Sequence, residues 1–294
     1  YEQTFDPDGR PADCWVFGDL VYVHKRHVAA VGFSRDEMTM TPMTYDEMRP
    51  GCYDPKARVE DQEMNHVEAS LCFPTFPRFC GQTFTEHPDR DLGLACVQAY
   101  NDWMVEEWCG DSDGALIPLA IVPLWDAELA AAEVRRNAER GVHAVCFSEI
   151  PPHLGLPSIH TNFWDPFLAA CQDTQTTINM HIGSSSRMPA TSADAPVAVA
   201  ASLSFNNSMA SMSDWLFSGK LVQFPDLTPK TLVPANRDEI HDFVRATGGT
   251  GVIKPLDGVK PKGIAGATLS GDGSVVLVLD MEELFRDAPT NTRQ

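Results

Sequence analysis

His181 has the clearest chemical position in the sequence. It closes the apolar run Thr177 to His181, and the small residues Gly183 to Ser186 follow it directly. This pattern indicates a strand that ends in a histidine and a turn. In a barrel of parallel strands, chemistry is built at the carboxyl ends of the strands, and an imidazole there can bind a metal ion or carry a proton. We therefore predict that His181 is catalytic and a metal ligand, with a hydrogen-bonded core histidine as the alternative.

Glu149 is the second candidate for catalysis. It lies two residues beyond the apolar segment Val142 to Phe147, which is typical of a strand. A carboxylate at the mouth of a barrel could accept a proton or hold a substrate. The alternative is a loop carboxylate without a chemical role.

Four further residues are candidates for binding a substrate. Arg78 ends the segment Pro74-Thr-Phe-Pro-Arg, and its planar guanidinium suits a substrate carboxylate, unless it is simply ion-paired or solvated. His160 and Trp164 lie between a strand and a helix, where they either line the mouth of the site or pack at the start of the helix. Ser184 could bond ligand oxygens or cap the next segment; its Gly-Ser-Ser-Ser sequence is not the GxSxG of a serine hydrolase.

Other polar residues carry weaker signals. His24 and His27 are three positions apart, but their segment has the pattern of an irregular loop, which favours solvated side chains. Asp280 ends an apolar strand that belongs to a hairpin pattern. Lys254 could approach a phosphate, yet no glycine-rich cradle follows it.

The elements that must position these residues alternate between strand and helix. Apolar runs predict strands, and helical spacing of apolar residues predicts helices. The helix that starts at Asp126 should stop at Gly141. Such alternation with short loops indicates a parallel α/β unit, which would bring Glu149 and His181 to one face. The predicted strands are 67–73, 116–122, 142–147 and 177–182, and the predicted helices are 91–109, 126–140, 164–174 and 209–217.

Composition limits the class of protein. The net charge of −19 disfavours nucleic acid and anionic membrane surfaces as partners. Eight cysteines form no CxxC pair, which favours free thiols in a reducing, cytoplasmic setting. The longest apolar stretch, Ala115 to Trp125, contains two prolines and is too short to span a bilayer. We expect a small-molecule substrate, and a homo-oligomer is compatible with these features.

The two ends of the sequence differ from its middle. Residues 1–60 are rich in Pro, Asp and Met and favour an irregular surface excursion. After Leu227 the pattern predicts strand, helix and strand over 229–258, then a β-hairpin over 263–280 around Ser270-Gly-Asp-Gly273. We therefore predict one domain over 1–227, an α+β appendage over 228–285 and a disordered tail over 286–294.

A resemblance to a known family covers the middle of the chain. The stretch from about Asp46 to Leu227 resembles the amidohydrolase-related superfamily of metal-dependent hydrolases, and within it the branch that includes aminocarboxymuconate-semialdehyde decarboxylase. The segments that carry the resemblance are Tyr45-Asp-Glu-Met-Arg-Pro-Gly-Cys-Tyr-Asp-Pro55, Leu71-Cys-Phe-Pro-Thr-Phe-Pro-Arg78, Ala99-Tyr-Asn-Asp-Trp103, Pro123-Leu-Trp-Asp126, Gly155-Leu-Pro-Ser-Ile-His160, Trp164-Asp-Pro-Phe167, Met180-His-Ile-Gly183 and Asp214-Trp-Leu-Phe217.

This resemblance implies a (β/α)₈ barrel that holds a divalent metal, usually zinc. The family's ligands are an HxH or ExH pair on the first strand, a histidine on a middle strand and an aspartate on the last. Only His181 has a counterpart here, and no HxH occurs in the sequence. The resemblance thus predicts an α/β fold, namely an incomplete TIM-type barrel without its first and last strands. The implied activity is metal-dependent hydrolysis or non-oxidative decarboxylation of a small carboxylate-bearing substrate, with zinc at low occupancy.

Shorter resemblances cover the C-terminal part. Residues 229–258 resemble a piece of an ATP-grasp glutathione synthetase, and residues 254–285 resemble the regulatory domain of chemotaxis histidine kinases. Two alternatives to the hydrolase therefore stay open. One is a catalytically inactive fragment or interaction module, and the other is a fragment of an ATP-dependent ligase.

Overall fold

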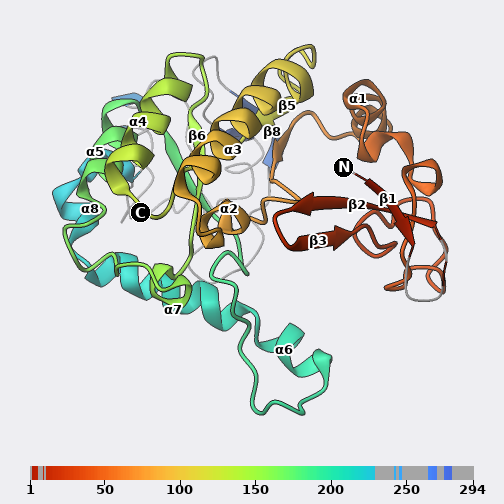
Figure 1. The fold of residues 1–294 in the computed structure, drawn as a ribbon. Coiled ribbons are helices and arrows are strands. Elements are labelled where there is room, and N and C mark those ends of the chain that lie inside the picture. Colours follow the sequence, from red (N-terminus) through yellow and green to blue (C-terminus); the bar gives the residue numbers. More distant parts are fainter. Residues whose placement is uncertain are drawn as a thin grey trace, which may run out of the picture. The chain divides into compact units, whose positions relative to one another are not determined.

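The computed structural model describes residues 2–5, 9, 11–228, 242, 245–246, 264–269 and 275–279 (Figure 1). The chain divides into two compact units, Tyr1–Leu227 and Thr228–Gln294. Within the described ranges, no helix is both long enough and apolar enough to cross a membrane.

Four parallel strands form the centre of the first unit. Strand β4 (Ser70–Cys72) pairs with β5 (Leu116–Pro118), and β6 (Ala144–Phe147) pairs with β7 (Thr177–Met180). A parallel bridge between Ala120 and Val145 joins the two pairs. Strands that follow one another in the chain are therefore neighbours, and helices connect them, as in a TIM-type α/β fold.

Local sequence signals explain where the helices begin and end. The Asp126 carboxylate accepts hydrogen bonds from the backbone of Glu128 and Leu129 at the start of α4, and Gly141 follows its end with a φ of 81°. Helix α3 is continued by one stretch of π-helix, Met104–Trp108. The α-helices are α1 (Pro55–Met64), α2 (Gln82–Glu86), α3 (Arg90–Trp103), α4 (Ala127–Ala138), α5 (Asp165–Asp173), α6 (Val197–Leu203), α7 (Phe205–Phe217) and α8 (Lys220–Gln223), and the 3₁₀ turns are Tyr45–Glu47, Pro50–Cys52, Pro151–Leu154 and Pro225–Leu227.

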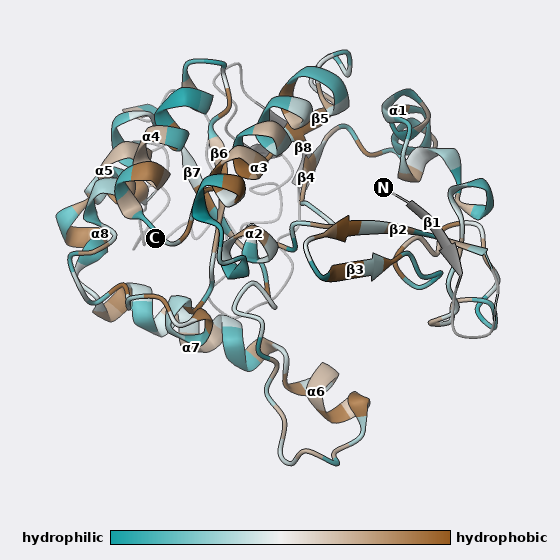
Figure 2. Ribbon diagram, viewed as in Figure 1, coloured by the Kyte–Doolittle hydropathy of each residue, from teal (hydrophilic) through white to brown (hydrophobic). Residues whose placement is uncertain are grey.

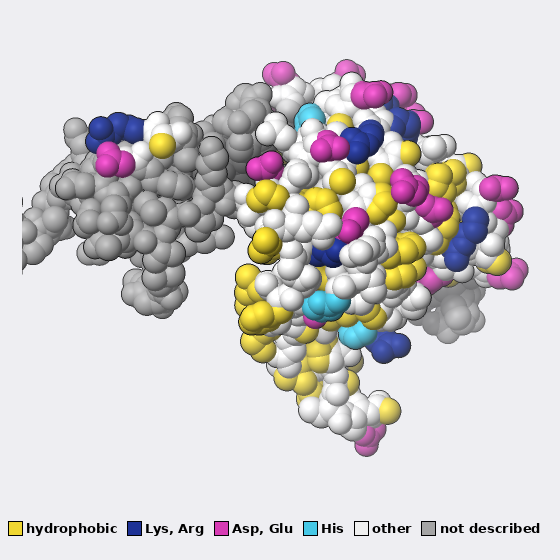
Figure 3. Space-filling model, turned by 90° about the vertical axis from the view of Figure 1, so that its left-hand side faces the viewer, with side chains coloured by type: hydrophobic (Ala, Val, Ile, Leu, Met, Phe, Trp, Pro, Cys, Tyr) yellow, Lys and Arg dark blue, Asp and Glu magenta, His cyan; other side chains and the backbone are white. Residues whose placement is uncertain are grey.

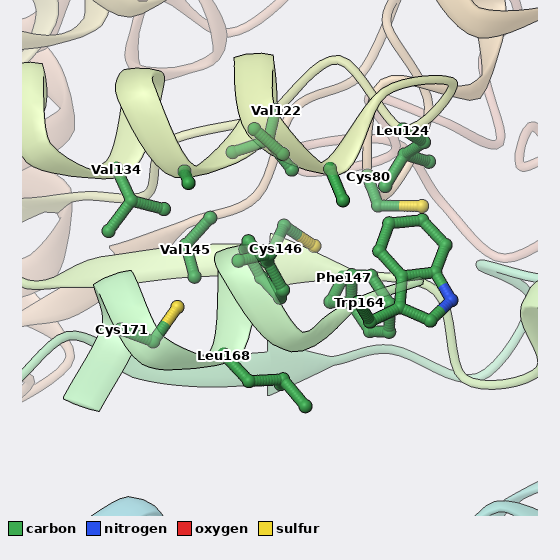
Figure 4. Packing of buried hydrophobic residues seen from close by; sticks show 14 of the residues in the cluster. Cys80, Val122, Leu124, Val134, Val145, Cys146, Phe147, Trp164, Leu168 and Cys171 are labelled. Carbon is green, nitrogen blue, oxygen red and sulfur yellow. The ribbon is translucent and has the colours of Figure 1, made fainter. Parts of the chain in front are cut away.

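The hydrophobic core lies between the strands and α4 and α5. Phe147 of β6 stacks on Phe167 of α5 at 5.0 Å between ring centroids and meets Trp164 edge-on at 4.8 Å. Figure 4 shows the side chains of Phe147 and Trp164 next to each other in this core. Along α4 and α5 hydrophilic and hydrophobic residues alternate, as expected for helices with one face in a core (Figure 2). Packing of β6 against both helices fixes where the loop after β6 begins.

A buried polar contact ties α3 to α4. The Asn101 amide donates to Oε1 of Glu133 at 2.7 Å and to the carbonyl of Ile121 at 2.9 Å, and its own oxygen accepts from the Ile121 backbone at 2.9 Å. Glu133 is only 2% exposed. Because a buried polar group is costly without partners, this network sets the position of the segment after β5.

The prediction of an irregular segment over residues 1–60 is wrong for its beginning and its end, whereas residues 24–44 contain no helix or strand. An antiparallel sheet of β1 (Glu2–Phe5), β2 (Pro11–Phe17) and β3 (Leu20–Val23) occupies its beginning. Strands β2 and β3 are joined by Gly18-Asp19, and Gly18 has a φ of 56°, which suits a two-residue hairpin loop. Within the first unit, ring contacts of Phe17 with Phe84 and of Trp15 with Phe76 connect the sheet to the segment after β4.

The remaining elements largely follow the predictions, with shorter strands. Each predicted strand between 67 and 217 contains a shorter observed strand, and each predicted helix overlaps an observed helix. The predicted hairpin is confirmed: β8 (Ile264–Leu269) pairs antiparallel with β9 (Val275–Leu279). The predictions for Lys254, for Asp280, for the tail over 286–294 and, apart from residues 242 and 245–246, for 229–258 lie outside the described residues.

Candidate functional site

Two neighbouring strands bring Glu149 and the turn after His181 together. Phe147 at the end of β6 is in register with Met180 at the end of β7. Glu149 and His181 therefore follow at the same sheet edge, as the sequence predicted. The carboxylate of Glu149 meets the turn two residues beyond His181, where Oε1 accepts from the Gly183 backbone at 2.9 Å.

Oε1 of Glu149 is the acceptor for three donors. Besides Gly183, it accepts from the Ser185 hydroxyl at 2.8 Å and from the Asn207 amide of α7 at 3.2 Å. Glu149 is 3% exposed, and Ser185 is fully buried. The carboxylate thus joins three segments: the loop after β6, the turn after β7 and helix α7. Oε2 has no hydrogen-bond partner among the described residues.

Ser184 has a structural position in this turn. Its hydroxyl accepts from the Glu149 backbone at 2.8 Å, and its carbonyl accepts from the Ser148 hydroxyl at 3.2 Å and the Cys80 thiol at 3.5 Å. The residue is fully buried. These contacts tie Ser184 to the loop after β6 and to Cys80, a structural role that neither of the two predictions for Ser184 included.

Gly183 allows the turn to approach an aromatic ring closely. Its φ is 97°, and an added Cβ would lie 3.0 Å from the Phe79 ring. A side chain at this position would therefore be strained and would displace Phe79. The same ring stacks on the imidazole of His181, with centroids 4.0 Å apart and an angle of 7° between the planes.

Contacts on several sides hold the imidazole ring of His181 in one orientation. Its Nδ1 lies 2.6 Å from the carbonyl oxygen of Ile182, and Phe73 meets the ring edge-on at 5.1 Å. When Nδ1–H donates to a backbone carbonyl, Nε2 is the nitrogen that can take a proton or a metal ion. His181 is half-buried, so Nε2 is the group of this site that best suits chemistry.

The other predicted substrate-binding residues each have a partner of their own. Arg78 forms an ion pair with Glu86 of α2 at 2.5 Å. His160 is exposed, and its Nε2 lies 3.1 Å from Oδ1 of Asp214. Trp164 is fully buried and donates its indole N–H to the Pro157 carbonyl at 2.7 Å, so packing at the helix start explains it better than substrate contact.

The described residues do not make up a metal centre. Among them, no group of three or more His, Cys, Asp or Glu side chains is placed to hold an ion. A stable zinc site needs three or four ligands, and His181 alone supplies one. The part of the chain that the structure describes therefore does not fit a complete zinc site.

Sequence reasoning missed the contribution of α7. Asn207, Ser211 and Trp215 are buried and lie four residues apart, which places them on one face of the helix. This polar and aromatic stripe was visible in the sequence, but nothing in it pointed to Glu149 as the partner. Trp215 and Ser211 also line a hollow of about 320 Å³ beside Glu149.

Solved structures show what the fold resembles. An amidohydrolase from Mycobacterium avium subsp. paratuberculosis aligns over 80% of this chain and 68% of its own, with 18% identity and a TM-score of 0.50. Two further structures are more distant. A putative amidohydrolase from Staphylococcus aureus has 13% sequence identity and a TM-score of 0.44, and the alignment covers 58% of this chain and 56% of that protein. For 5-carboxyvanillate decarboxylase from Sphingomonas paucimobilis the identity is 16% and the TM-score 0.41, with 57% of this chain and 48% of that protein covered. At such identities the first likeness bears on the fold alone.

Two family profiles match the sequence, and no curated protein does. The profile of the prokaryotic glutathione synthetase ATP-grasp domain matches residues 219–286, while the chemotaxis resemblance finds no support. The amidohydrolase profile matches residues 12–228, so the likeness starts well before Asp46, where we had placed it. With most of its length matched, the chain belongs to the amidohydrolase family.

Proposed function

We propose that this chain is a hydrolase or non-oxidative decarboxylase that acts on a small carboxylate-bearing substrate at the ends of β6 and β7. The observation that carries the proposal is His181: it follows β7, and its Nδ1 is engaged by a backbone carbonyl at 2.6 Å. Family membership supports the reaction class. A net charge of −19 supports a small-molecule substrate over nucleic acid.

His181, Glu149 and Arg78 would have different roles in this reaction. Nε2 of His181 would give or take the proton at the reacting carbon or carbonyl oxygen. Glu149 would act by holding the turn from Gly183 to Ser185, and with it the orientation of His181. Arg78 would exchange its ion pair with Glu86 for the substrate carboxylate, to which a guanidinium offers two parallel donors.

Members of this family typically use a divalent metal. In this chain His181 would be its ligand, and zinc is the ion we expect. Because the described residues hold no group of three or more possible His, Cys, Asp or Glu ligands, we assign no step of the reaction to a metal ion.

The test is an activity screen with matched histidine variants. Amide, lactone and aromatic carboxylate substrates are offered with and without added zinc or manganese, and hydrolysis and CO₂ release are followed by NMR. We expect His181→Ala to lower turnover by roughly 100-fold or more, as for loss of a general acid or base. His143→Ala is the control, because His143 is exposed and precedes β6 at the opposite end of the sheet.

Equal turnover in both variants would refute the role of His181. No turnover with any substrate or metal would favour the competing interpretation, a catalytically inactive fragment or interaction module.

A second candidate, a fragment of an ATP-dependent ligase, is favoured by the profile match over residues 219–286. The first part of that match, Gly219–Leu227, belongs to the first unit, where Lys220 of α8 pairs with Asp165 of α5. We therefore expect millimolar ATP with magnesium to leave the melting temperature unchanged. A rise in melting temperature that Lys254→Ala removes would support the ligase, since a ligand that binds the folded state stabilises it.

A further inference from the structure

Three sulfur atoms lie in one cluster beside the end of β4. Cys109 follows the π-helix Met104–Trp108, and its Sγ lies 3.7 Å from Sδ of Met104 at the start of that helix. Cys72, the last residue of β4, packs against the same cluster, and its thiol shares a hydrogen bond with the thiol of Cys109. Met104 is 3% exposed and Cys109 is 8% exposed, whereas Cys72 is half-buried. Two thiols and a thioether are thus grouped, and Cys72 is the member that solvent reaches.

The chemistry of this cluster favours a soft metal ion. Thiolate and thioether sulfurs are the ligands that select Cu(I). Three sulfurs around one ion, with bonds of about 2.3 Å as in zinc thiolates, lie about 4 Å from one another in a trigonal plane. The 3.7 Å between Sγ of Cys109 and Sδ of Met104 is close to that separation. Zinc sites use Cys, His, Asp and Glu instead, so a cluster with a thioether differs from them.

Hydrogen-bond donors surround the sulfur of Cys72. It accepts from the indole N–H of Trp108 and from the backbone N–H of Ile117. The hydroxyl of Tyr100, which packs against the same cluster, is buried and has no hydrogen-bond partner among the residues that the structure describes. Burial raises the pKa of Tyr100, so the hydroxyl keeps its proton and stays a donor. An ionised sulfur is a stronger acceptor than a thiol, and such donors hold metal-binding sulfurs in place.

The cluster differs from the site proposed for the reaction. Phe73, the residue after Cys72, meets the ring of His181 edge-on at 5.1 Å. Successive side chains along a strand point to opposite faces of the sheet. Cys72 is therefore directed to the other face, where it packs with Trp108 and Tyr100.

We propose that Cys72, Cys109 and Met104 bind one Cu(I) ion through their three sulfur atoms, and that the ion takes the place of the proton between the two thiols. The thiol protons leave to water, and copper stays in the same oxidation state. Two thiolates and Cu(I) carry a net charge of −1, which the nearby guanidinium of Arg58 offsets. The molecule also attracts cations, since its net charge is −19 and Asp and Glu side chains are spread over the face in Figure 3. This proposal is independent of the reaction at His181.

The test is a titration of the whole reduced chain with Cu(I) under argon. Bathocuproine disulfonate is present as a coloured chelator that takes Cu(I) from single thiols. We expect one Cu(I) per chain to be withheld from the chelator, although the chain has eight cysteines. X-ray absorption at the copper edge then counts the neighbours of the ion, and we expect three sulfurs.

Substitutions at each sulfur test the assigned ligands. Cys72→Ser and Cys109→Ser each remove a thiolate and should weaken Cu(I) binding by roughly 100-fold or more. Met104→Leu keeps the volume of the side chain, so it should fold, and it should leave two sulfur neighbours and weaken binding by about tenfold. The matched control is Cys96→Ser, because Cys96 is half-buried like Cys72 but lies on α3 and is not part of the cluster. Cys72 is half-buried, so Cys72→Ser keeps the test valid if Cys109→Ser does not fold.

Three outcomes would overturn the proposal: no Cu(I) withheld from the chelator, two sulfur neighbours in the wild type, or equal losses in Cys96→Ser and Cys72→Ser, as for an adventitious ion on scattered thiols. The readout is binding, and His181→Ala should retain it. Failure of the copper site therefore leaves the proposed reaction untouched.

Discussion

The hydroxyl of Ser185 donates to Oε1 of Glu149 at 2.8 Å, although the two residues are 36 positions apart. The bond links the turn after β7 to the loop after β6. Both side chains are buried, so water cannot replace either partner. The conformation of the turn that follows His181 therefore depends on a carboxylate supplied by the neighbouring strand.

Removal of this carboxylate should destabilise the first unit. Glu149→Ala leaves the donors of Gly183, Ser185 and Asn207 without their shared acceptor, which should cost about 3 kcal/mol or more of the free energy of unfolding. Ser185→Ala removes one bond and should cost about 1 kcal/mol. Urea unfolding measures both. The exposed Ser202→Ala should stay within about 0.5 kcal/mol, and a Glu149→Ala variant as stable as this control would contradict the structural role of Glu149.

The amount of zinc bound to the purified protein tests whether the chain forms a complete metal site. We expect less than one zinc per chain at neutral pH, because the described residues hold no group of three or more possible His, Cys, Asp or Glu ligands, and a stable zinc site needs three or four. Metal analysis of the purified protein gives the stoichiometry, beside that of His181→Ala and His143→Ala. One tightly held zinc per chain that only His181→Ala removes would show that ligands lie elsewhere in the sequence.

Periodicity was enough to predict the strand and helix order around the site. Apolar runs that end in Glu149 and His181 predict two parallel strands with their carboxyl ends together, and the register of Phe147 with Met180 agrees. The N-terminal sheet was missed although Cys14-Trp-Val-Phe17 and Leu20-Val-Tyr-Val23 are apolar runs on either side of Gly18-Asp19, which is a hairpin pattern. The Pro, Asp and Met content of residues 1–60 had favoured an irregular segment instead.

Side-chain partners were much harder to predict. Nothing in the sequence says that the Asn207 amide reaches Glu149, which is 58 positions away. Trp164 was a candidate for the mouth because it lies between a strand and a helix, yet its large ring is fully buried in the core. Spacing fixes the face of an element on which a residue lies. Which side chain it meets depends on how elements pack, and that information is not local.

Two ion pairs on α5 should differ sharply in their effect on stability. Nζ of Lys220 is 2.5 Å from Oδ1 of Asp165, and Lys220 is only 3% exposed. Lys220→Ala removes a buried cation but leaves a partly exposed Asp165 that still accepts from the Gln223 amide at 2.8 Å, so it should cost about 1.5–3 kcal/mol. The control is Arg135→Ala. It breaks an exposed ion pair between Arg135 of α4 and Asp173 of α5, and it should cost at most about 1 kcal/mol of the free energy of unfolding. Chemical denaturation compares them, and equal costs would show that Lys220 does not hold α8 on α5.

Cys72 should be unusually reactive near neutral pH. A hydrogen bond from the Cys109 thiol lowers the pKa of Cys72 from 9.0 to about 7, and burial only partly opposes this. The same hydrogen bond raises the pKa of Cys109, because that residue keeps the proton. Since the thiolate is the nucleophile, alkylation of Cys72 by iodoacetamide should rise as pH increases through about 7.

Peptide mass spectrometry after timed alkylation gives the rate at each cysteine. Burial raises the pKa of Cys96, so this residue should react only at higher pH and serves as the internal control. Cys109→Ala removes the donor and should move the profile of Cys72 upwards towards 9.0, whereas Cys109→Ser keeps a donor and should retain part of the effect. A Cys72 profile that coincides with that of Cys96, or that Cys109→Ala leaves in place, would show that the two thiols do not share a proton.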